Sequence, residues 1–165
     1  MHTFVALDVE IASRTPLHVC AIGAARFENG VEVASRVSLV RTEGRVRYTQ
    51  IHGLTIGDLR RAPSWNTAWR SMLPLFDAVE DVVAFRAEFD RAAVLSMAAR
   101  HGVRLPRLHF TCAAEVAHAH LGTRLSLAET LARLNIPYPG TPHEPLSDAR
   151  AAAAVFLACS QVERP

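Results

Sequence analysis

Two carboxylates stand two positions apart near the start of the chain. Asp8 and Glu10 follow an apolar run, Thr3 to Leu7, which is typical of a buried strand. Because side chains two apart on a strand point to the same face, we expect these acids to lie side by side. Burying them unpaired is costly, and a divalent cation removes both the desolvation and the repulsion. Asp-x-Glu alone is nevertheless a weak motif, and taken singly it is more often a solvated strand end.

Two more acids and a histidine stand in similar settings. Asp90 begins a helix expected from about residue 88, directly after a short strand over 82–85, and ligands collect at such strand ends in α/β sheets. In the segment His143-Glu-Pro-Leu-Ser-Asp148, flanking prolines would keep His143 on a loop while Asp148 enters the last helix. That arrangement suits a proton acceptor near a metal-bound water. Taken singly, Asp90 could instead complement a helix dipole, and His143 could be a surface residue.

Other residues that could carry chemistry give weaker signals. His118 and His120 are two apart on an expected helix and diverge, so they cannot chelate one metal. The arginines at 45, 47, 60 and 61 indicate a solvated face, with a phosphate-tracking patch as the alternative. The sequence contains no glycine-rich phosphate loop and no Gly-x-Ser-x-Gly elbow, which argues against NTPase and serine hydrolase functions.

The elements that must position these residues follow from the hydrophobic pattern. Glu28-Asn29-Gly30 lies between two apolar runs and predicts a hairpin. Residues 42–64 read as loop with a short helix, and Ser64 should cap a helix. We expect strands over 3–7, 19–27, 31–40, 82–85 and 108–112, and helices over 65–76, 88–101, 113–121, 125–134 and 145–159. The pattern predicts an α/β fold with a mixed five-stranded sheet flanked by helices.

Composition limits the class of protein. The chain has 165 residues, half of them hydrophobic and about a fifth charged, which fits a single domain over 1–165. No apolar run approaches the length of a membrane span, and no secretory signal begins the chain, so we expect a soluble, cytoplasmic protein. The three cysteines, Cys20, Cys112 and Cys159, are widely spaced and predict buried free thiols.

The net charge alone gives no polycationic signal for nucleic acid, but bound metal would change it. The formal charge is +2, and every basic residue is arginine. Two divalent ions would add four charges to +2 and give about +6 for the loaded protein.

Taken in order, these segments resemble the DEDDh exonuclease family, which includes the proofreading epsilon subunit of bacterial DNA polymerase III, ribonuclease T and oligoribonuclease. The matching segments are Phe4-Val-Ala-Leu-Asp8-Val-Glu10, Val83-Ala-Phe-Arg-Ala-Glu-Phe-Asp90 and His143-Glu-Pro-Leu-Ser-Asp148-Ala149. Ile22-Gly23-Ala24 and Ile51-His52-Gly53-Leu54, followed by Ala62-Pro63, add to the likeness. A sister subclass has tyrosine where Glu144 stands, so His143 indicates the h type.

The resemblance implies a ribonuclease-H-like fold and two Mg²⁺ or Mn²⁺ ions. Asp8, Glu10 and Asp148 would hold one metal, Asp8 would bridge to the second, and Asp90 would act largely through bound water. His143 would take the proton from the attacking water. Oxygen ligands favour magnesium or manganese over zinc.

Departures from the family pattern fall on residues that would contact substrate. Phe85-Arg86 stands where the family often has His-Asn, and Ile11-Ala12 where threonine is usual. The backbone at Ile11 and Ala12 would meet the 3′-terminal nucleotide, with Leu54 as a wedge against its base. Arg86 would contact a phosphate, and Phe85 would either stack on a base or pack in the core.

The sequence therefore predicts a metal-dependent 3′–5′ exonuclease acting on single-stranded DNA or RNA ends. The alternative is a catalytically weak nucleic-acid-binding or polymerase-associated accessory domain, suggested by the Phe85-Arg86 departure. The choice between DNA and RNA stays open, as do a DNA polymerase partner and a homodimer.

Overall fold

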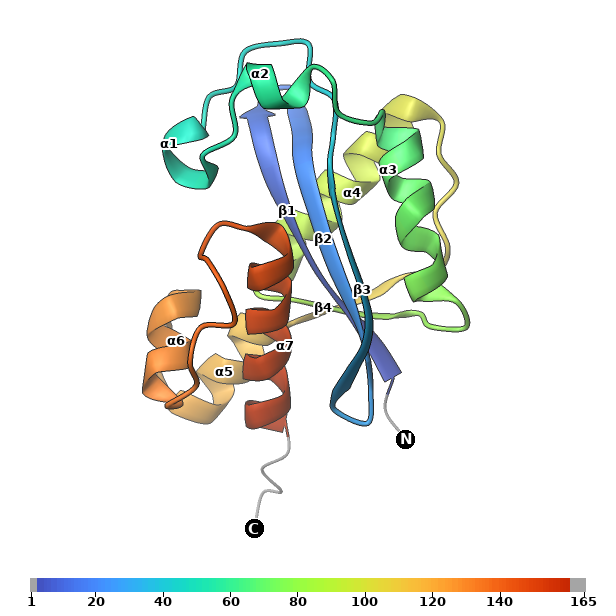
Figure 1. The fold of residues 1–165 in the computed structure, drawn as a ribbon. Helices are drawn as coiled ribbons and strands as arrows, with labels where there is room; N and C mark the ends of the chain where they lie inside the picture. Colours follow the sequence, from blue (N-terminus) through green and yellow to red (C-terminus); the bar gives the residue numbers. More distant parts are fainter. Residues whose placement is uncertain (1–2, 161–165) are drawn as a thin grey trace.

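The chain forms a five-stranded sheet with helices on both faces, as expected, in a computed structural model that describes residues 3–160 (Figure 1). The strands are β1 (Thr3–Arg14), β2 (Leu17–Glu28), β3 (Val31–Leu39), β4 (Asp81–Ala84) and β5 (His109–Cys112). The helices are α1 (Thr49–His52), α2 (Ile56–Leu59), α3 (Trp65–Met72), the 3₁₀ helix η1 (Leu73–Phe76), α4 (Ala87–His101), α5 (Ala113–Leu121), α6 (Leu127–Arg133) and α7 (Pro145–Ser160).

The sheet is mixed, in the order β3-β2-β1-β4-β5. β1, β2 and β3 pair antiparallel, whereas β4 runs parallel to both β1 and β5. The expected hairpin joins β2 to β3, and its two central residues, Asn29 and Gly30, have φ angles of 52° and 81°. Positive φ at both positions is what a two-residue hairpin of this hand requires. The Asn-Gly prediction is confirmed.

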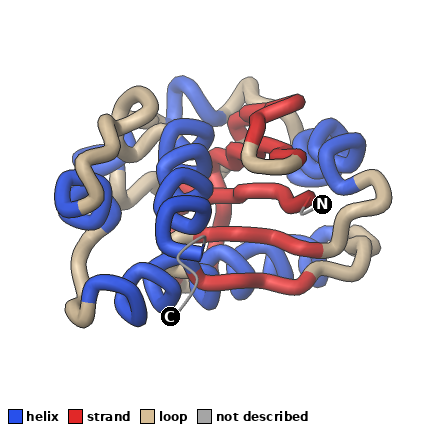
Figure 2. The backbone as a smooth tube through the Cα atoms, turned by 90° about the horizontal axis from the view of Figure 1, so that it is seen from below, coloured by secondary structure: helices blue, strands red, loops and turns tan. Residues whose placement is uncertain are grey.

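Helices of different character cover the two faces of the sheet (Figures 1 and 2). α3 and α4 bury large side chains on one face, including Trp65, Trp69 and Met72. α5, α6 and α7 lie on the other face, where α7 contributes mainly alanines, Ala149 and 151–153, against Phe4 and Ala6 of β1. Small residues let α7 approach the sheet closely.

Several element boundaries match the sequence prediction. Ser64 caps α3 by accepting a hydrogen bond from the Thr67 N–H, and Gly102 ends α4 in the left-handed conformation. The helix expected over 65–76 ends at Met72 and continues as a 3₁₀ turn, because Pro74 cannot donate a helical hydrogen bond. Within 42–64 the chain forms two short helices, α1 and α2, rather than one.

The first strand was predicted too short. β1 does not end before Asp8 but continues to Arg14, still paired with β2. Two irregularities, between Glu10 and Ile11 and between Ile11 and Ser13, let the pairing continue while the strand bends. The carboxylates therefore lie within a strand next to a bulge, and not at its end.

The cysteines and helices also bear on the composition arguments. Cys20 and Cys159 are buried free thiols as predicted, whereas Cys112 is only partly buried. Within residues 3–160, no helix combines the length and apolar character needed to cross a bilayer.

Candidate active site

Alternation along β1 determines where the first two carboxylates point. Val5, Leu7 and Val9 enter the core beneath α3 and α4, whereas Phe4 and Ala6 enter the core beneath α7. Even-numbered side chains share one face of a strand, so Asp8 and Glu10 continue the Phe4–Ala6 row. Both carboxylates therefore lie on the side of the sheet that α7 covers.

A glycine on the neighbouring strand brings the last helix to these carboxylates. Gly23 of β2 pairs directly with Asp8. A side chain at Gly23 would collide with the backbone of Pro145 and Leu146, and its Cβ would lie 2.7 Å from the Leu146 Cα. The start of α7 therefore rests on bare backbone, and Asp148 in its first turn faces the cleft.

The fourth acid comes from the helix that follows β4. β4 runs beside β1, with Val82 opposite Val5, so α4 leaves the sheet next to the carboxylates. Asp90 in the first turn of α4 is 3% exposed and accepts a hydrogen bond of 3.1 Å from the Val9 N–H. This bond ties α4 to β1 beside Asp8.

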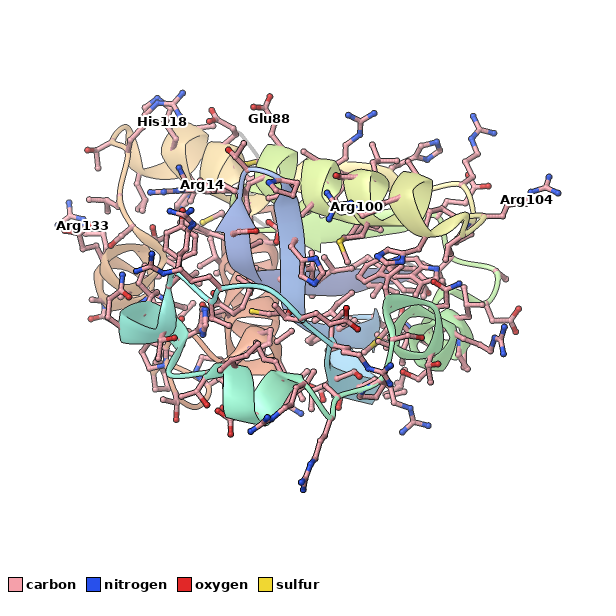
Figure 3. All side chains as sticks on the ribbon, turned by 90° about the horizontal axis from the view of Figure 1, so that it is seen from above. Arg14, Glu88, Arg100, Arg104, His118 and Arg133 are labelled. Atoms are coloured by element: carbon pink, nitrogen blue, oxygen red, sulfur yellow. The ribbon has the colours of Figure 1, made fainter. Side chains whose placement is uncertain are left out.

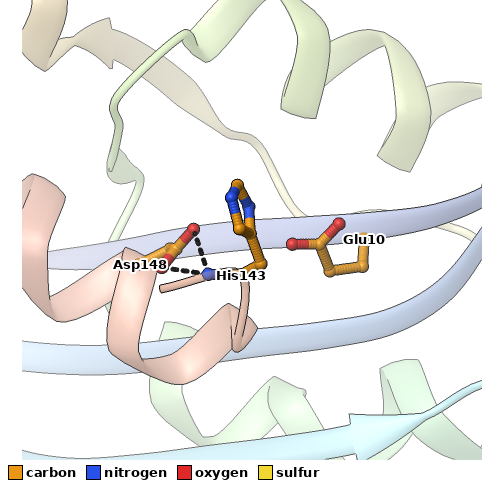
Figure 4. A group of neighbouring side chains, drawn as sticks. All are labelled: Glu10, His143 and Asp148. Carbon is orange, nitrogen blue, oxygen red and sulfur yellow. Dashed lines mark hydrogen bonds between the residues drawn. The ribbon is translucent and has the colours of Figure 1, made fainter. Parts of the chain in front are cut away.

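The histidine lies on the loop before α7, as the sequence predicted. His143 has a φ of 64°, and its N–H donates to Asp148 at 3.1 Å from Oδ1 and 3.3 Å from Oδ2. Figure 4 shows the exposed imidazole standing between the carboxylates of Asp148 and Glu10. One ligand atom from each of these three residues lies within 4.8 Å of the other two.

One cleft of about 480 Å³ collects all five residues of the expected catalytic set. Its lining comprises Asp8, Glu10, Asp90, His143 and Asp148, together with Val9, Arg14, Phe85, Arg86, Phe89, Ser126 and Leu127. These residues derive from β1, the β4–α4 junction, the start of α6 and the start of α7. Segments more than 130 residues apart in sequence thus share one cavity.

The gathered carboxylates are electrostatically uncompensated. Burial, followed by the charges of Asp148 and Asp90, raises the pKa of Glu10 to about 8. Burial also raises the pKa of Asp90 to about 7, against the opposing hydrogen bond from Val9, and raises the pKa of Asp8 well above its usual range. Within residues 3–160, no arginine forms an ion pair with any of these acids. The cluster therefore favours an added cation.

The donor set indicates which cation would fit. Four carboxylates offer hard oxygen ligands, and the one nearby nitrogen ligand, His143, is on an exposed loop. Oxygen-rich sites of this kind suit Mg²⁺ or Mn²⁺, while the absence of cysteine from the cleft lining disfavours a thiolate zinc site. The residues fit a hard divalent cation.

A small apolar recess adjoins the cleft. It has a volume of about 160 Å³ and shares Val9, Glu10, Arg14 and Phe89 with the cleft. Ile11, Tyr48 and Ile51 complete its lining. Ile11, which was expected to contact substrate, therefore lines this recess. Tyr48 and Ile51 were not singled out in the sequence, because short loop helices give no periodic signal.

Two expected substrate contacts lie elsewhere. Ala12 is 1% exposed and packs with Cys20 and Leu59, and Leu54 packs against the same small cluster. Neither lines the cleft or the recess. The bulge after Glu10 turns the Ala12 side chain inward, and the Leu54 N–H donates to His52 Nδ1, which fixes the local turn. Ile51, three residues before Leu54, lines the recess.

Phe85 and Arg86, which depart from the family pattern, lie in different environments. Phe85 is 7% exposed and belongs to the core beneath α7, with one edge on the cleft. Arg86 is exposed at the start of α4, between the cleft and a second cavity of about 550 Å³. Arg14 also borders the cleft, whereas Arg104 and Arg133 extend outward from opposite sides of the molecule (Figure 3).

Tyr138 contacts the site, although its sequence context did not indicate a functional role. The Tyr138 hydroxyl donates a hydrogen bond of 2.6 Å to Asp148 Oδ1. Tyr138 is ten residues before Asp148, on the proline-rich loop that also carries His143.

Comparisons with known proteins identify the family of the chain and relatives of its fold. A sequence model of the exonuclease family RNase_T matches residues 5–156, whereas no curated protein sequence matches the chain significantly. The fold is similar to the nuclease domain of 3′hExo, a DEDDh family member, bound to rAMP (13% identity, TM-score 0.79, 96% of this chain and 92% of that chain). It is also similar to E. coli Exonuclease I in complex with a 5cy-dT13 oligonucleotide (13% identity, TM-score 0.76, 98% of this chain and 41% of that chain). A third similar structure is Exonuclease X in complex with 5′ overhanging duplex DNA (18% identity, TM-score 0.67, 96% of this chain and 92% of that chain).

Proposed function

Because the chain belongs to the RNase_T exonuclease family, we propose that it is a DEDDh-type enzyme that removes nucleotides singly from the 3′ ends of single-stranded DNA or RNA. In this proposal residues 1–165 act as one exonuclease domain. The observation that carries it is the meeting of four carboxylates and one imidazole in a single cleft.

In this proposal the carboxylates hold two Mg²⁺ or Mn²⁺ ions. Asp8, Glu10 and Asp148 would bind one ion, Asp8 would also bind the second, and Asp90 would act through water. Two metal ions bound in this way supply an activated water and stabilise charge on the leaving oxygen. The pKa of Glu10, raised to about 8, and the raised pKa of Asp8 support this role. Both shifts show that the site disfavours the negative charge of these carboxylates, and a bound cation would stabilise that charge.

His143 is proposed as the proton acceptor. Its imidazole is exposed on a loop, and its backbone N–H is held by Asp148, so the ring can move while its attachment stays fixed. Imidazole is the side chain that enzymes use most often as a general base. The Glu10–His143–Asp148 grouping would also permit ligation by His143, and metal binding by His143→Ala distinguishes the two roles.

The cavities around the carboxylates suggest how a strand end would bind. The apolar recess, lined by Tyr48, Ile51 and Phe89, would receive the 3′-terminal nucleoside, with the backbone at Ile11 alongside. The wedge role expected for Leu54 would pass to Ile51. Arg86 would contact the phosphate of the strand where it leaves the cleft. The rAMP and oligonucleotide in the similar structures are consistent with such a ligand.

A labelled oligonucleotide tests the function. Single-stranded DNA and RNA 20-mers labelled at the 5′ end, incubated with the protein and Mg²⁺ or Mn²⁺, should give one-nucleotide ladders that EDTA abolishes. Comparing the two ladders identifies the preferred nucleic acid, and a blocked 3′ end should prevent shortening. Arg104→Ala, which alters a distant outward side chain, serves as the matched control.

Binding without shortening would instead support the accessory role. Undiminished cleavage by Asp8→Ala would refute the assignment of the site. Size-exclusion chromatography of the same preparation would distinguish a free-standing enzyme from a homodimer.

A further inference from the structure

Tyr138 makes a contact with the proposed metal site that the catalytic set does not explain. Its hydroxyl lies 2.6 Å from Asp148 Oδ1, which also accepts the His143 N–H at 3.1 Å. Both donors come from the loop between α6 and α7, and the acceptor lies in the first turn of α7. One oxygen of this acid is therefore doubly bound by the loop. Oδ2 receives only the longer contact from His143, at 3.3 Å.

We propose that Tyr138 is a positioning residue that fixes the Asp148 carboxylate so that Oδ2 is presented to a divalent cation, and joins this ligand to the loop carrying His143. The inference rests on the proposed metal-dependent function. A hydrogen-bonded partner behind a ligating carboxylate restricts its rotation and tunes its affinity for metal.

The loop is built to hold Tyr138 in place. The Gly140 N–H donates to the Tyr138 carbonyl at 2.9 Å, and a side chain at Gly140 would collide with Ser147. Ser147 in turn donates to Glu144 at 2.9 Å. Three prolines, at 137, 139 and 142, restrict the backbone further. The position of the hydroxyl is therefore set by contacts within the loop and at the start of α7.

The chemistry of the hydroxyl suits a permanent donor. The Tyr138 hydroxyl is a neutral donor that binds Asp148 Oδ1, so it holds the carboxylate without adding charge to the site. The ring packs against the core beneath α7, which leaves the hydroxyl as the one polar end directed at the site. Tyr138 is thus neither a proton acceptor nor a nucleophile in this arrangement.

Tyr138→Phe isolates the hydroxyl, because the ring and its packing remain. The Kd for Mn²⁺, measured by calorimetry without substrate, should rise about 10-fold or more. The Mg²⁺ concentration for half-maximal cleavage should rise by a similar factor, and saturating Mg²⁺ should restore most of the activity. A merely structural role would lower the melting temperature and leave both metal constants unchanged, and that result overturns the inference.

Tyr48→Phe is the matched control, since the chain has only two tyrosines. Tyr48 lies in the recess, so its variant should keep the wild-type Mn²⁺ affinity whatever happens to turnover. An equal loss of affinity in both variants would overturn the specific role of Tyr138.

A labelled wild-type protein gives the answer should Tyr138→Phe not fold. With fluorotyrosine incorporated, the Tyr138 resonance, assigned by comparison with Tyr48→Phe, should shift as Mg²⁺ is added, with the Kd found by calorimetry. A resonance unmoved by bound Mg²⁺ overturns the inference. If the wild type binds no metal and cleaves nothing, the proposed function itself fails, whereas normal metal binding by Tyr138→Phe defeats the positioning role alone.

Discussion

Two groups of acidic side chains on this sheet differ in whether an arginine pairs with them. Around the cleft, four acids gather with no arginine paired to them among the residues described. Near the β2–β3 hairpin, Arg150 of α7 binds Glu32 through two hydrogen bonds of 2.8 and 2.7 Å. Arg26 binds Glu28 at 2.9 Å in the same region. The same helix, α7, therefore carries one acid into an unpaired cluster and one arginine into a satisfied pair.

The difference shows in the direction of the pKa shifts. Burial raises the pKa of Glu10 to about 8, whereas hydrogen bonds from Arg150 lower the pKa of Glu32. A raised carboxyl pKa means that the fold disfavours the charge, and a lowered one means that it favours the charge. The cleft thus gives up stability in the metal-free protein to keep ligands available, and the hairpin region contributes stability.

Asp8→Asn should break this contrast most strongly. The amide cannot serve as an anionic ligand, so exonuclease activity should fall below detection. Because the substitution removes one of four crowded charges, the metal-free variant should melt at a higher temperature than the wild type. Calorimetric melting in EDTA measures the second effect. A lower melting temperature would show that the carboxylate stabilises the fold, contrary to the account.

Gly23→Ala tests the close approach that brings Asp148 into the cluster. The added methyl group would meet the backbone of Pro145 and Leu146, so α7 must shift. Overpacking of this kind costs about 1–3 kcal/mol, and the displacement of Asp148 should lower turnover further. Urea denaturation and the ladder assay measure the two effects. Gly44→Ala, where a Cβ meets nothing within 4 Å, should change neither.

The two groups of acids should make stability depend on pH in opposite directions. Unfolding returns the pKa of Glu10 from about 8 toward 4.5, so its contribution destabilises the fold as pH rises between these values. The metal-free protein should therefore melt higher at pH 5.5 than at pH 8, and saturating Mg²⁺ should reduce the difference. Glu32 acts in the opposite sense, since its stabilisation is lost only as pH falls through its lowered pKa. Melting that rises steadily toward pH 8 without metal would contradict the assignment.

Arg150→Met should give the smallest effect. The pair with Glu32 is about one-third exposed, so its loss should cost about 0.5–1 kcal/mol. Cleavage should be unaffected, because Arg150 does not line the cleft. Urea denaturation measures the cost, and an activity loss of 10-fold or more would show that the hairpin region is coupled to the site.

Much of the fold followed from local sequence patterns. Asn29-Gly30 specifies its turn through the positive φ angles it tolerates, and Ser64 and Gly102 mark helix ends through hydrogen bonds made within a few residues. The extension of β1 past Asp8 was missed because its bulges depend on pairing with β2, which is a tertiary contact.

The site divides in the same way. The five expected residues share one cleft because each stands at a strand or helix position that the topology brings together. Ile51 was missed because it lies in a four-residue helix too short to give a periodic signal. Tyr138 was missed because it lies on an irregular loop, whose path is set by packing rather than by periodicity. Leu54 was misplaced for the same reason, since three residues along such a loop can reverse the direction of a side chain.

The central claim is that acids from distant segments share divalent cations in this cleft. Crystals soaked with Mn²⁺ and a nucleoside monophosphate, examined by anomalous diffraction, test it directly. We predict two manganese peaks about 4 Å apart, one among Asp8, Glu10 and Asp148 and the other beside Asp8 on the side of Asp90. Manganese bound elsewhere, with these carboxylates left without a cation, would contradict the account.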